Sequence, residues 1–239
     1  IAVWAIQMIW IPFHAAGVIN GLGHYWGYRN YETQDASTNL WPFGIWIGGE
    51  ELHNNHHAFP SSAKFSMKKW EFDIGWMYIK IFSALGLVKV KKLAPKPYIE
   101  EGRETIDLDT IKAVFANRLH VMANYAKQVT LPVLKQQACV DNACKQALRK
   151  AKNLLVREYP QMDEASKTEL EEVLSSNEEL ETVYKFRVQL QQVWGRAASS
   201  HDALVQALRE WCAQAEATGI KYLQDFAKSL RHYSPAPAA

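Results

Sequence analysis

The chain opens on the stretch IAVWAIQMIWIPFHAAGVINGLGHYWGY, residues 1–28, which contains no Asp, Glu, Lys or Arg. Its mostly apolar residues 1–19 are about long enough to cross the hydrocarbon core of a bilayer as an α-helix. A secretory signal is disfavoured because the stretch lacks a basic n-region. The remaining alternative is a buried helix of a soluble protein. Residues 1–19 therefore predict a transmembrane helix.

Composition divides the chain into two unlike halves. The 239 residues carry 27 Lys+Arg and 25 Asp+Glu, and a net charge of +2 argues against a dedicated nucleic-acid-binding protein. Residues 1–99 hold seven of the nine Trp and five of the eight His, but only 15 of the 52 charged side chains. The other 37 lie in residues 100–239. This break predicts that the two halves face different solvents.

The region after the first span is basic and then apolar. Seven lysines between Lys64 and Lys92 indicate that this flank is cytoplasmic. Residues 74–88, IGWMYIKIFSALGLV, are too few for a span and predict a buried or interfacial helix. His14, inside the first span, is expected to be a hydrogen-bonded histidine rather than a ligand.

The second half shows helical periodicity, because its apolar residues recur every three or four positions. Helix breaks are expected near Pro132, Pro160 and residues 195–200, and Gly219 interrupts the last pattern. Ser200 or Asp202 could cap the helix that follows. The stripes comprise Ile111, Val114, Phe115, Leu119, Met122 and Tyr125; Leu148, Ala151, Leu154 and Leu155; Leu170, Val173, Leu174, Leu180, Val183 and Tyr184; and Leu204, Leu208, Trp211, Cys212, Ala215, Leu223, Phe226 and Leu230.

We therefore expect an all-α protein in four parts. A transmembrane or interfacial helical domain is predicted over residues 1–97, and a linker over residues 98–103. A soluble bundle of about four antiparallel helices is predicted over residues 104–233. The Pro- and Ala-rich tail, residues 234–239, is predicted to be disordered.

The strongest chemical signal is a cluster of three histidines within five residues: His53, His56 and His57. On a helix these positions share one face, where neutral imidazoles are common metal ligands. His56 and His57 diverge by about 100° around a helix, so they could reach two different ions. The alternative is a solvated polar helix face. His24 is a further candidate ligand, and it shares a helix face with Asn20.

Residues 18–60, VINGLGHYWGYRNYETQDASTNLWPFGIWIGGEELHNNHHAFP, resemble the C-terminal catalytic part of membrane fatty acyl desaturases of the Δ9 type. The family carries an Asn-x-x-x-His element, an Arg, an Asp-x-x-x-Asn element and Gly-Glu-x-x-His-Asn-x-His-His-x-Phe-Pro. In this chain these elements are Asn20/His24, Arg29, Asp35/Asn39 and residues 49–60. Trp70, Phe72, Asp73 and the following ALGLV stretch also fit the family.

The resemblance implies a di-iron enzyme of the bacterial inner membrane, with its catalytic and C-terminal parts cytoplasmic. Such an enzyme uses O₂ and donated electrons to introduce a double bond into a saturated acyl chain. Its partners would be an acyl-CoA or acyl-lipid substrate, membrane lipid, and a donor such as ferredoxin or a flavin reductase. The implied ligands of the two Fe ions are His24, His53, His56 and His57. The residues expected to support these ligands are Asn20, Asp35, Asn39 and Glu50.

The chain departs from the family pattern because the first two histidine boxes do not occur in it. We therefore expect a C-terminal piece that is inactive alone. The alternative is a membrane-anchored helical interaction protein with a degenerate, inactive His metal site. The helical half is also similar to C-terminal helical segments of bacterial transposases and to extensions on proteobacterial Δ9 desaturases. It lacks an accompanying triad of catalytic acids, so a docking role is expected.

Overall fold

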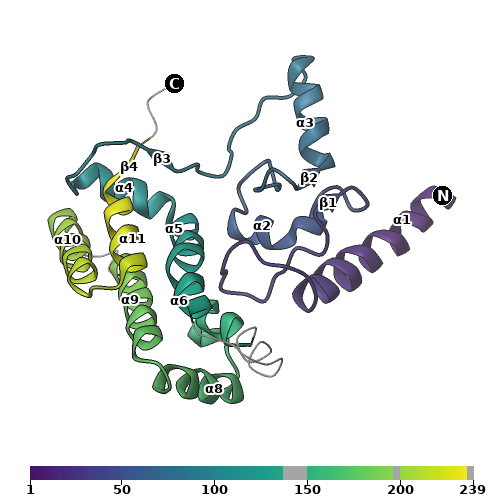
Figure 1. Ribbon diagram of the computed structural model, residues 1–239. Coiled ribbons are helices and arrows are strands. Elements are labelled where there is room, and N and C mark those ends of the chain that lie inside the picture. The colour runs from purple at the N-terminus through teal and green to yellow at the C-terminus, as the bar shows by residue number, and fades with distance from the viewer. Residues whose placement is uncertain (137–149, 196–199, 236–239) are drawn as a thin grey trace. The chain divides into compact units, whose positions relative to one another are not determined.

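The computed structural model describes residues 1–136, 150–195 and 200–235. The chain divides into two compact units, Ile1–Ala94 and Pro95–Ala239, and each is considered by itself (Figure 1). Described residues outside loops are almost entirely helical, and the strands are two residues long. The all-α prediction is confirmed.

The first unit begins with one long helical segment. Helix α1, Ala2–Pro12, continues as a π-helix, η1, Phe13–Gly21, and ends in a 3₁₀ turn, η2, Leu22–His24. The change to wider winding directly after Pro12 is consistent with a proline that cannot donate a backbone hydrogen bond. Ala2–His24 is long and apolar enough to cross a membrane, and almost none of it is buried within the protein. This exposure suits a helix whose apolar surface faces lipid.

A second helix of this unit is also exposed. Helix α3, Ile74–Ala84, begins where Asp73 accepts a hydrogen bond from the Trp76 amide. No residue of α3 is buried, and Tyr78, Ile81 and Phe82 are exposed. The helix predicted over residues 74–88 is present, and its exposure fits the interfacial alternative rather than the buried one.

A short parallel strand pair joins the segments around the histidines. Strand β1, Phe43–Gly44, pairs with β2, Phe72–Asp73, in the register Phe43↔Phe72. A Cβ on Gly44 would lie 2.8 Å from the Gly49 Cα, so only glycine permits this backbone approach. The chain then forms a 3₁₀ turn, η3, Glu50–Leu52, and helix α2, His53–Ala58.

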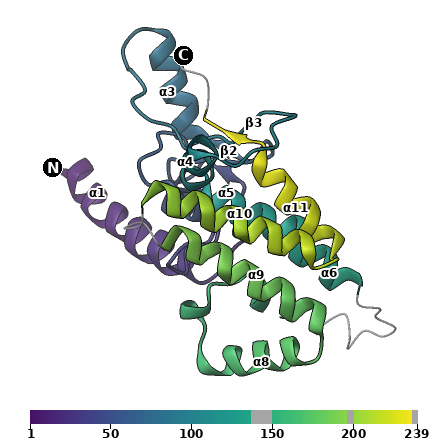
Figure 2. The same ribbon diagram turned by 90° about the vertical axis from the view of Figure 1, so that its left-hand side faces the viewer.

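The second unit is a helical bundle in which α9, α10 and α11 lie side by side (Figures 1 and 2). Its core includes Tyr125, Trp211 and Phe226, whose rings meet edge to face. The predicted stripes supply most of this core; Leu148 lies outside the described residues. The elements are α4, Leu108–Ala116; α5, Arg118–Tyr125; the π-helix η4, Ala126–Thr130; α6, Leu131–Gln136; helical residues 150–156; η5, Tyr159–Gln161; α8, Glu164–Ser175; α9, Glu178–Gly195; α10, His201–Ala217; and α11, Lys221–Arg231.

Local signals set several helix ends in the bundle. Ser200 caps α10 by accepting a hydrogen bond from the Ala203 amide. Of the two candidates that the sequence offered, Ser200 and Asp202, the cap is therefore Ser200. Gly219 lies between α10 and α11 with a φ of 78°, a conformation that favours glycine. The bundle contains more and shorter helices than the four expected, partly because α4 ends at Asn117 before α5 begins.

The linker and tail predictions need correction. Strand β3, Tyr98–Ile99, pairs antiparallel with β4, Tyr233–Ser234, so Tyr98, Ile99 and Ser234 belong to the second unit. Arg103 adds a hydrogen bond to the Ser234 hydroxyl. Local composition does not predict backbone pairing between residues more than 130 positions apart. Residues 236–239 of the predicted tail lie outside the described residues.

Candidate metal centre

The histidine cluster lies on α2, a helix of only six residues. Isolated helices of this length are unstable in water, so tertiary contacts must hold it. Asn54 and Asn55 on its other side are fully buried. The Asn54 carboxamide oxygen accepts from the Asn30 and Tyr31 amides, at 2.9 and 3.0 Å. These contacts hold the helix on the side away from the histidines. The histidine side of the helix then faces His24, the last residue of η2.

Three imidazoles meet at this face. His24, His53 and His57 each offer a ligand atom, and these atoms lie within 4.8 Å of one another. His24 Nε2 is 3.0 Å from His53 Nε2. Two nitrogens bound about 2.1 Å from one metal ion at right angles would be about 3.0 Å apart. The spacing therefore fits two ligands of one ion, although a hydrogen bond between the rings gives the same distance.

His57 is oriented by the carboxylate of Asp35, whose Oδ2 lies 2.7 Å from His57 Nδ1. This contact leaves His57 Nε2 as the nitrogen available to an ion. A carboxylate on the far nitrogen of a metal-bound imidazole fixes the tautomer and raises its basicity. The predicted supporting role of Asp35 thus has a geometric basis.

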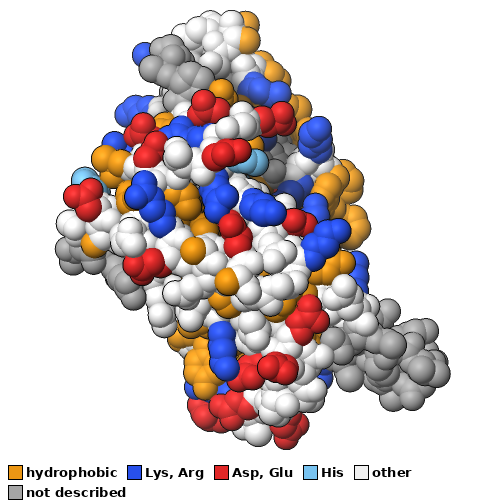
Figure 3. All heavy atoms as spheres, turned by 60° about the vertical axis from the view of Figure 1, so that its left-hand side comes forward, with side chains coloured by type: hydrophobic (Ala, Val, Ile, Leu, Met, Phe, Trp, Pro, Cys, Tyr) orange, Lys and Arg blue, Asp and Glu red, His pale blue; other side chains and the backbone are white. Residues whose placement is uncertain are grey.

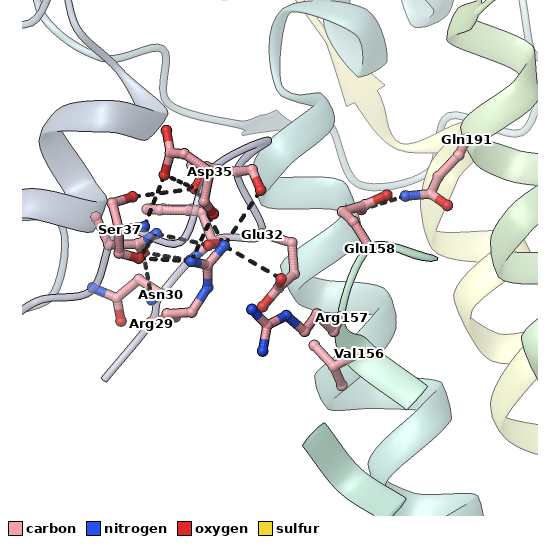
Figure 4. A network of polar contacts seen from close by, with 12 residues as sticks. Arg29, Asn30, Glu32, Asp35, Ser37, Val156, Arg157, Glu158 and Gln191 are labelled. Atoms are coloured by element: carbon pink, nitrogen blue, oxygen red, sulfur yellow. Dashed lines mark hydrogen bonds and ion pairs between the residues drawn. The ribbon is translucent and has the colours of Figure 1, made fainter. Parts of the chain in front are cut away.

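The loop that carries Asp35 is held by the guanidinium of Arg29 (Figure 4). Arg29 donates to the Asp35 and Ser37 carbonyl oxygens at 3.0 and 2.7 Å, and it forms an ion pair with Glu32 at 3.4 Å. The Asp35 carboxylate itself accepts from the Ser37 amide and the Thr33 hydroxyl. The aspartate is therefore fixed on both its backbone and its side chain.

His56 lies apart from the group of three. Its ring centre is 6.4 Å from that of His53 and 4.7 Å from that of Phe65. Within the described residues, the buried Nδ1 atoms of His56 and His53 have no hydrogen-bond partner. Unsatisfied buried ring nitrogens are costly, and an ion bound at His56 Nδ1 would remove that cost at His56; His53 meets His24 through its other nitrogen, Nε2. The divergence of His56 from His57 follows the prediction from helical geometry.

The electrostatics favour a neutral His53. Burial, with the neighbouring His57, His24 and His56, lowers the pKa of His53 to about 4. Burial acts to raise the pKa of Asp35, but hydrogen bonds from Ser37, His57 and Thr33 outweigh it and lower that pKa. The site therefore combines an unprotonated His53 with a charged Asp35 near neutral pH, which suits cation binding.

The other predicted supporting residues differ in their placement. Asn39 is buried, and its Oδ1 accepts a hydrogen bond from the Asn55 amide of α2. The Glu50 carboxylate is 4.0 Å from His53 Nδ1, too far for a hydrogen bond. Asn20 is exposed and makes no side-chain hydrogen bond within the described residues. His14 bonds to the Trp10 carbonyl oxygen at 2.9 Å, consistent with the noncatalytic interpretation.

Sequence reasoning missed Glu71, which is 8% exposed and bonded to side chains near the histidines. Its contacts include Tyr28 and Asn55. The available signal was a carboxylate between the aromatic residues Trp70 and Phe72, just before β2. Its partners are distant in sequence, so only folding identifies them.

Comparison with known proteins divides the chain in the same way. Residues 110–236 match a family model described as Transposase. Over this span, the chain belongs to the transposase family. The transposase-family segment comprises most of the helical bundle, whereas the desaturase motifs lie before it.

In the described part, positive and negative side chains are interleaved on the face shown in Figure 3.

Curated relatives are Δ9 desaturases. The sn-1 stearoyl-lipid 9-desaturase of Anabaena variabilis is 40% identical over 96 residues, covering 39% of this chain and 35% of that protein. The Delta-9 desaturase-like 4 protein of Arabidopsis thaliana is 41% identical over 85 residues, covering 36% and 28%. The sn-2 palmitoyl-lipid 9-desaturase of Nostoc sp. (strain 36) is 40% identical over 77 residues, covering 32% and 27%.

The chain thus spans about a third of the length of these relatives. These relatives are named as 9-desaturases, two of them of stearoyl- or palmitoyl-lipids, and the similarity supports a relationship to fatty acid desaturases. No solved structure matches the chain.

Proposed function

We propose that the first unit is part of a membrane di-iron fatty acyl desaturase. His24, His53 and His57 would hold one iron ion, and His56 would contribute to the second. The observation that carries the proposal is the meeting of three imidazoles, one of them oriented by Asp35 at 2.7 Å. The all-nitrogen donor set is compatible with iron, as is the unpartnered ring nitrogen of His56.

When bound, iron supplies the dioxygen-dependent oxidation that removes two hydrogens from a saturated acyl chain. The residues of this chain would fix the imidazoles, keep His53 unprotonated and hold the Asp35 carboxylate against His57. Four histidines do not complete two ions, so further ligands and most of the acyl tunnel would come from sequence outside this chain. The electron donor would be a separate ferredoxin or flavin reductase.

We place this site at the cytoplasmic face of a membrane. Ala2–His24 is the candidate span, and His24 is its last residue. Apolar side chains of α3 are exposed beside lysines that follow the span, as expected for a helix at the headgroup level. The acyl chain of a lipid or CoA ester would then approach the metal from the bilayer.

Metal loading tests the ligands. The full chain in detergent is incubated anaerobically with Fe²⁺, desalted and assayed for iron. Replacing His24, His53 or His57 with Ala should remove most of the bound iron. His120→Ala is the matched control, since His120 lies in the bundle and bonds to the Pro95 carbonyl. Equal iron in all variants would refute the ligand assignment.

A chimera tests the reaction. The matching part of the Anabaena variabilis relative is replaced by residues 1–94, and the lipids of a host expressing the chimera are analysed for Δ9 double bonds. Unsaturated product that disappears with His56→Ala would support the proposal. Iron binding without product in a folded chimera would favour the alternative, an interaction protein with an inactive metal site.

A further inference from the structure

Glu71 is a buried carboxylate in the first unit, and it is not among the proposed ligands. It is 8% exposed and directly precedes β2, which begins at Phe72. Five groups donate hydrogen bonds to its two oxygens. They are Tyr28 Oη at 2.9 Å and Asn30 Nδ2 at 2.5 Å on Oε1, and Asn55 Nδ2 at 2.9 Å, the Met67 amide at 2.6 Å and the Lys68 amide at 2.9 Å on Oε2.

A carboxylate accepts all five hydrogen bonds with no rearrangement of its partners. On Oε2, the Met67 and Lys68 backbone amides can only donate, so this side of the group must remain an acceptor. A glutamine would therefore turn its NH₂ group toward Asn30 Nδ2, which is a donor unless the Asn30 amide reverses and gives up its hydrogen bond to Asn55 Oδ1. Loss of the acceptor would leave buried donors unsatisfied, and hydrogen bonds to a charged acceptor are stronger than neutral ones.

Among these partners, Asn55 connects Glu71 to the metal centre. Residues advance by about 100° around an α-helix, so His53, His56 and His57 fill one arc of α2 and Asn55 lies on the opposite side. The Asn55 Nδ2 donates to Glu71, while its Oδ1 accepts from Asn30 and Asn39. Glu71 therefore fixes which way the Asn55 amide faces.

The charge also joins the histidine helix to the loop after η2. Asn30 donates both to Glu71 and to the Asn55 Oδ1, closing a triangle of hydrogen bonds. Because α2 has six residues, its rotation about its own axis depends on such outside contacts. A small rotation of α2 would move all three imidazoles together.

We propose that Glu71 is a positioning residue for the metal centre: through Asn55 and Asn30 it sets the rotation of α2 and hence the direction of its imidazoles. The inference rests on the proposed metal-binding function. It distinguishes Glu71 from Asp73, which is equally buried but binds the Phe65, Ser66 and Trp76 amides. Asp73 shapes a loop and caps α3 without touching the asparagines of α2.

The test uses Co²⁺ as the metal, titrated into the full chain in detergent, with affinity and visible ligand-field spectrum as readouts. Glu71→Gln should weaken Co²⁺ binding about tenfold or more and shift the bands, as outer contacts of metal ligands typically do. Asp73→Asn removes a charge of similar burial and should lower stability while leaving the bands unchanged. Tyr28→Phe removes one donor to Glu71 on the side away from Asn55 and should change the bands little.

The outcomes separate the two proposals. A wild-type chain that binds no Co²⁺ would overturn the metal-binding function itself. Wild-type affinity and spectrum in Glu71→Gln, or identical band shifts in Asp73→Asn, would overturn the positioning role alone. If Glu71→Gln does not fold by tryptophan fluorescence, Glu71→Asp decides, because it keeps the charge but shortens the reach by a methylene. A folded Glu71→Asp with the wild-type spectrum would also overturn the role.

Discussion

The contact between Asp35 and His57 provides a quantitative test of the metal centre. In Asp35→Asn, the side-chain oxygen still accepts from His57 Nδ1, but the negative charge that makes the imidazole more basic is lost. Removing such a contact typically costs 10- to 100-fold in metal affinity. The Asp35 side chain is 37% exposed, so water already weakens the 2.7 Å contact. We therefore expect a loss of about tenfold, equivalent to about 1.4 kcal/mol.

The assay is a Co²⁺ or Fe²⁺ titration of the full chain at pH 7.5, followed calorimetrically. Glu32→Gln is the matched control, because Glu32 lies on the same loop and pairs with Arg29 at 3.4 Å. It removes the same charge and should change affinity by less than about twofold if long-range charge is screened. An Asp35→Asn variant that binds as tightly as the wild type, or a control that loses as much, would refute the reasoning.

Three further predictions follow from the structure. Burial lowers the pKa of His53 from 6.5 to about 4, so the unfolded chain binds more protons than the folded chain between these pH values. The metal-free first unit should therefore lose stability as the pH falls from 6.5 to 4, which tryptophan fluorescence can measure. The His53→Gln variant should show a weaker dependence of stability on pH. Trp211 is 4% exposed and bonds the Phe186 carbonyl, so Trp211→Ala should destabilise the bundle by about 3–5 kcal/mol in urea unfolding; a change below about 1 kcal/mol would contradict the packing. Asp107 forms a capping box on α4, so Asp107→Ala should cost about 1 kcal/mol by the same measurement, whereas Asp109→Ala on the first turn should cost less.

Much of the candidate site could be predicted from local sequence. The i, i+3, i+4 spacing places His53, His56 and His57 on one face wherever that segment is helical, and the structure forms that helix. The pairing of Asp35 with His57 was predictable only as a supporting role through family resemblance. The partners of Glu71 were not predictable, because its donors lie up to 43 residues away along the chain.

The sequence by itself determined the helical class, the two unlike halves and the choice of candidate metal ligands. These properties depend on hydrophobic period, charge density and side-chain chemistry, which are local. The tertiary structure decided which imidazoles meet, which nitrogen of His57 remains available, and that Tyr98–Ile99 pairs with Tyr233–Ser234. Those outcomes depend on hydrogen bonds between distant segments, which form only when burial brings both partners out of water.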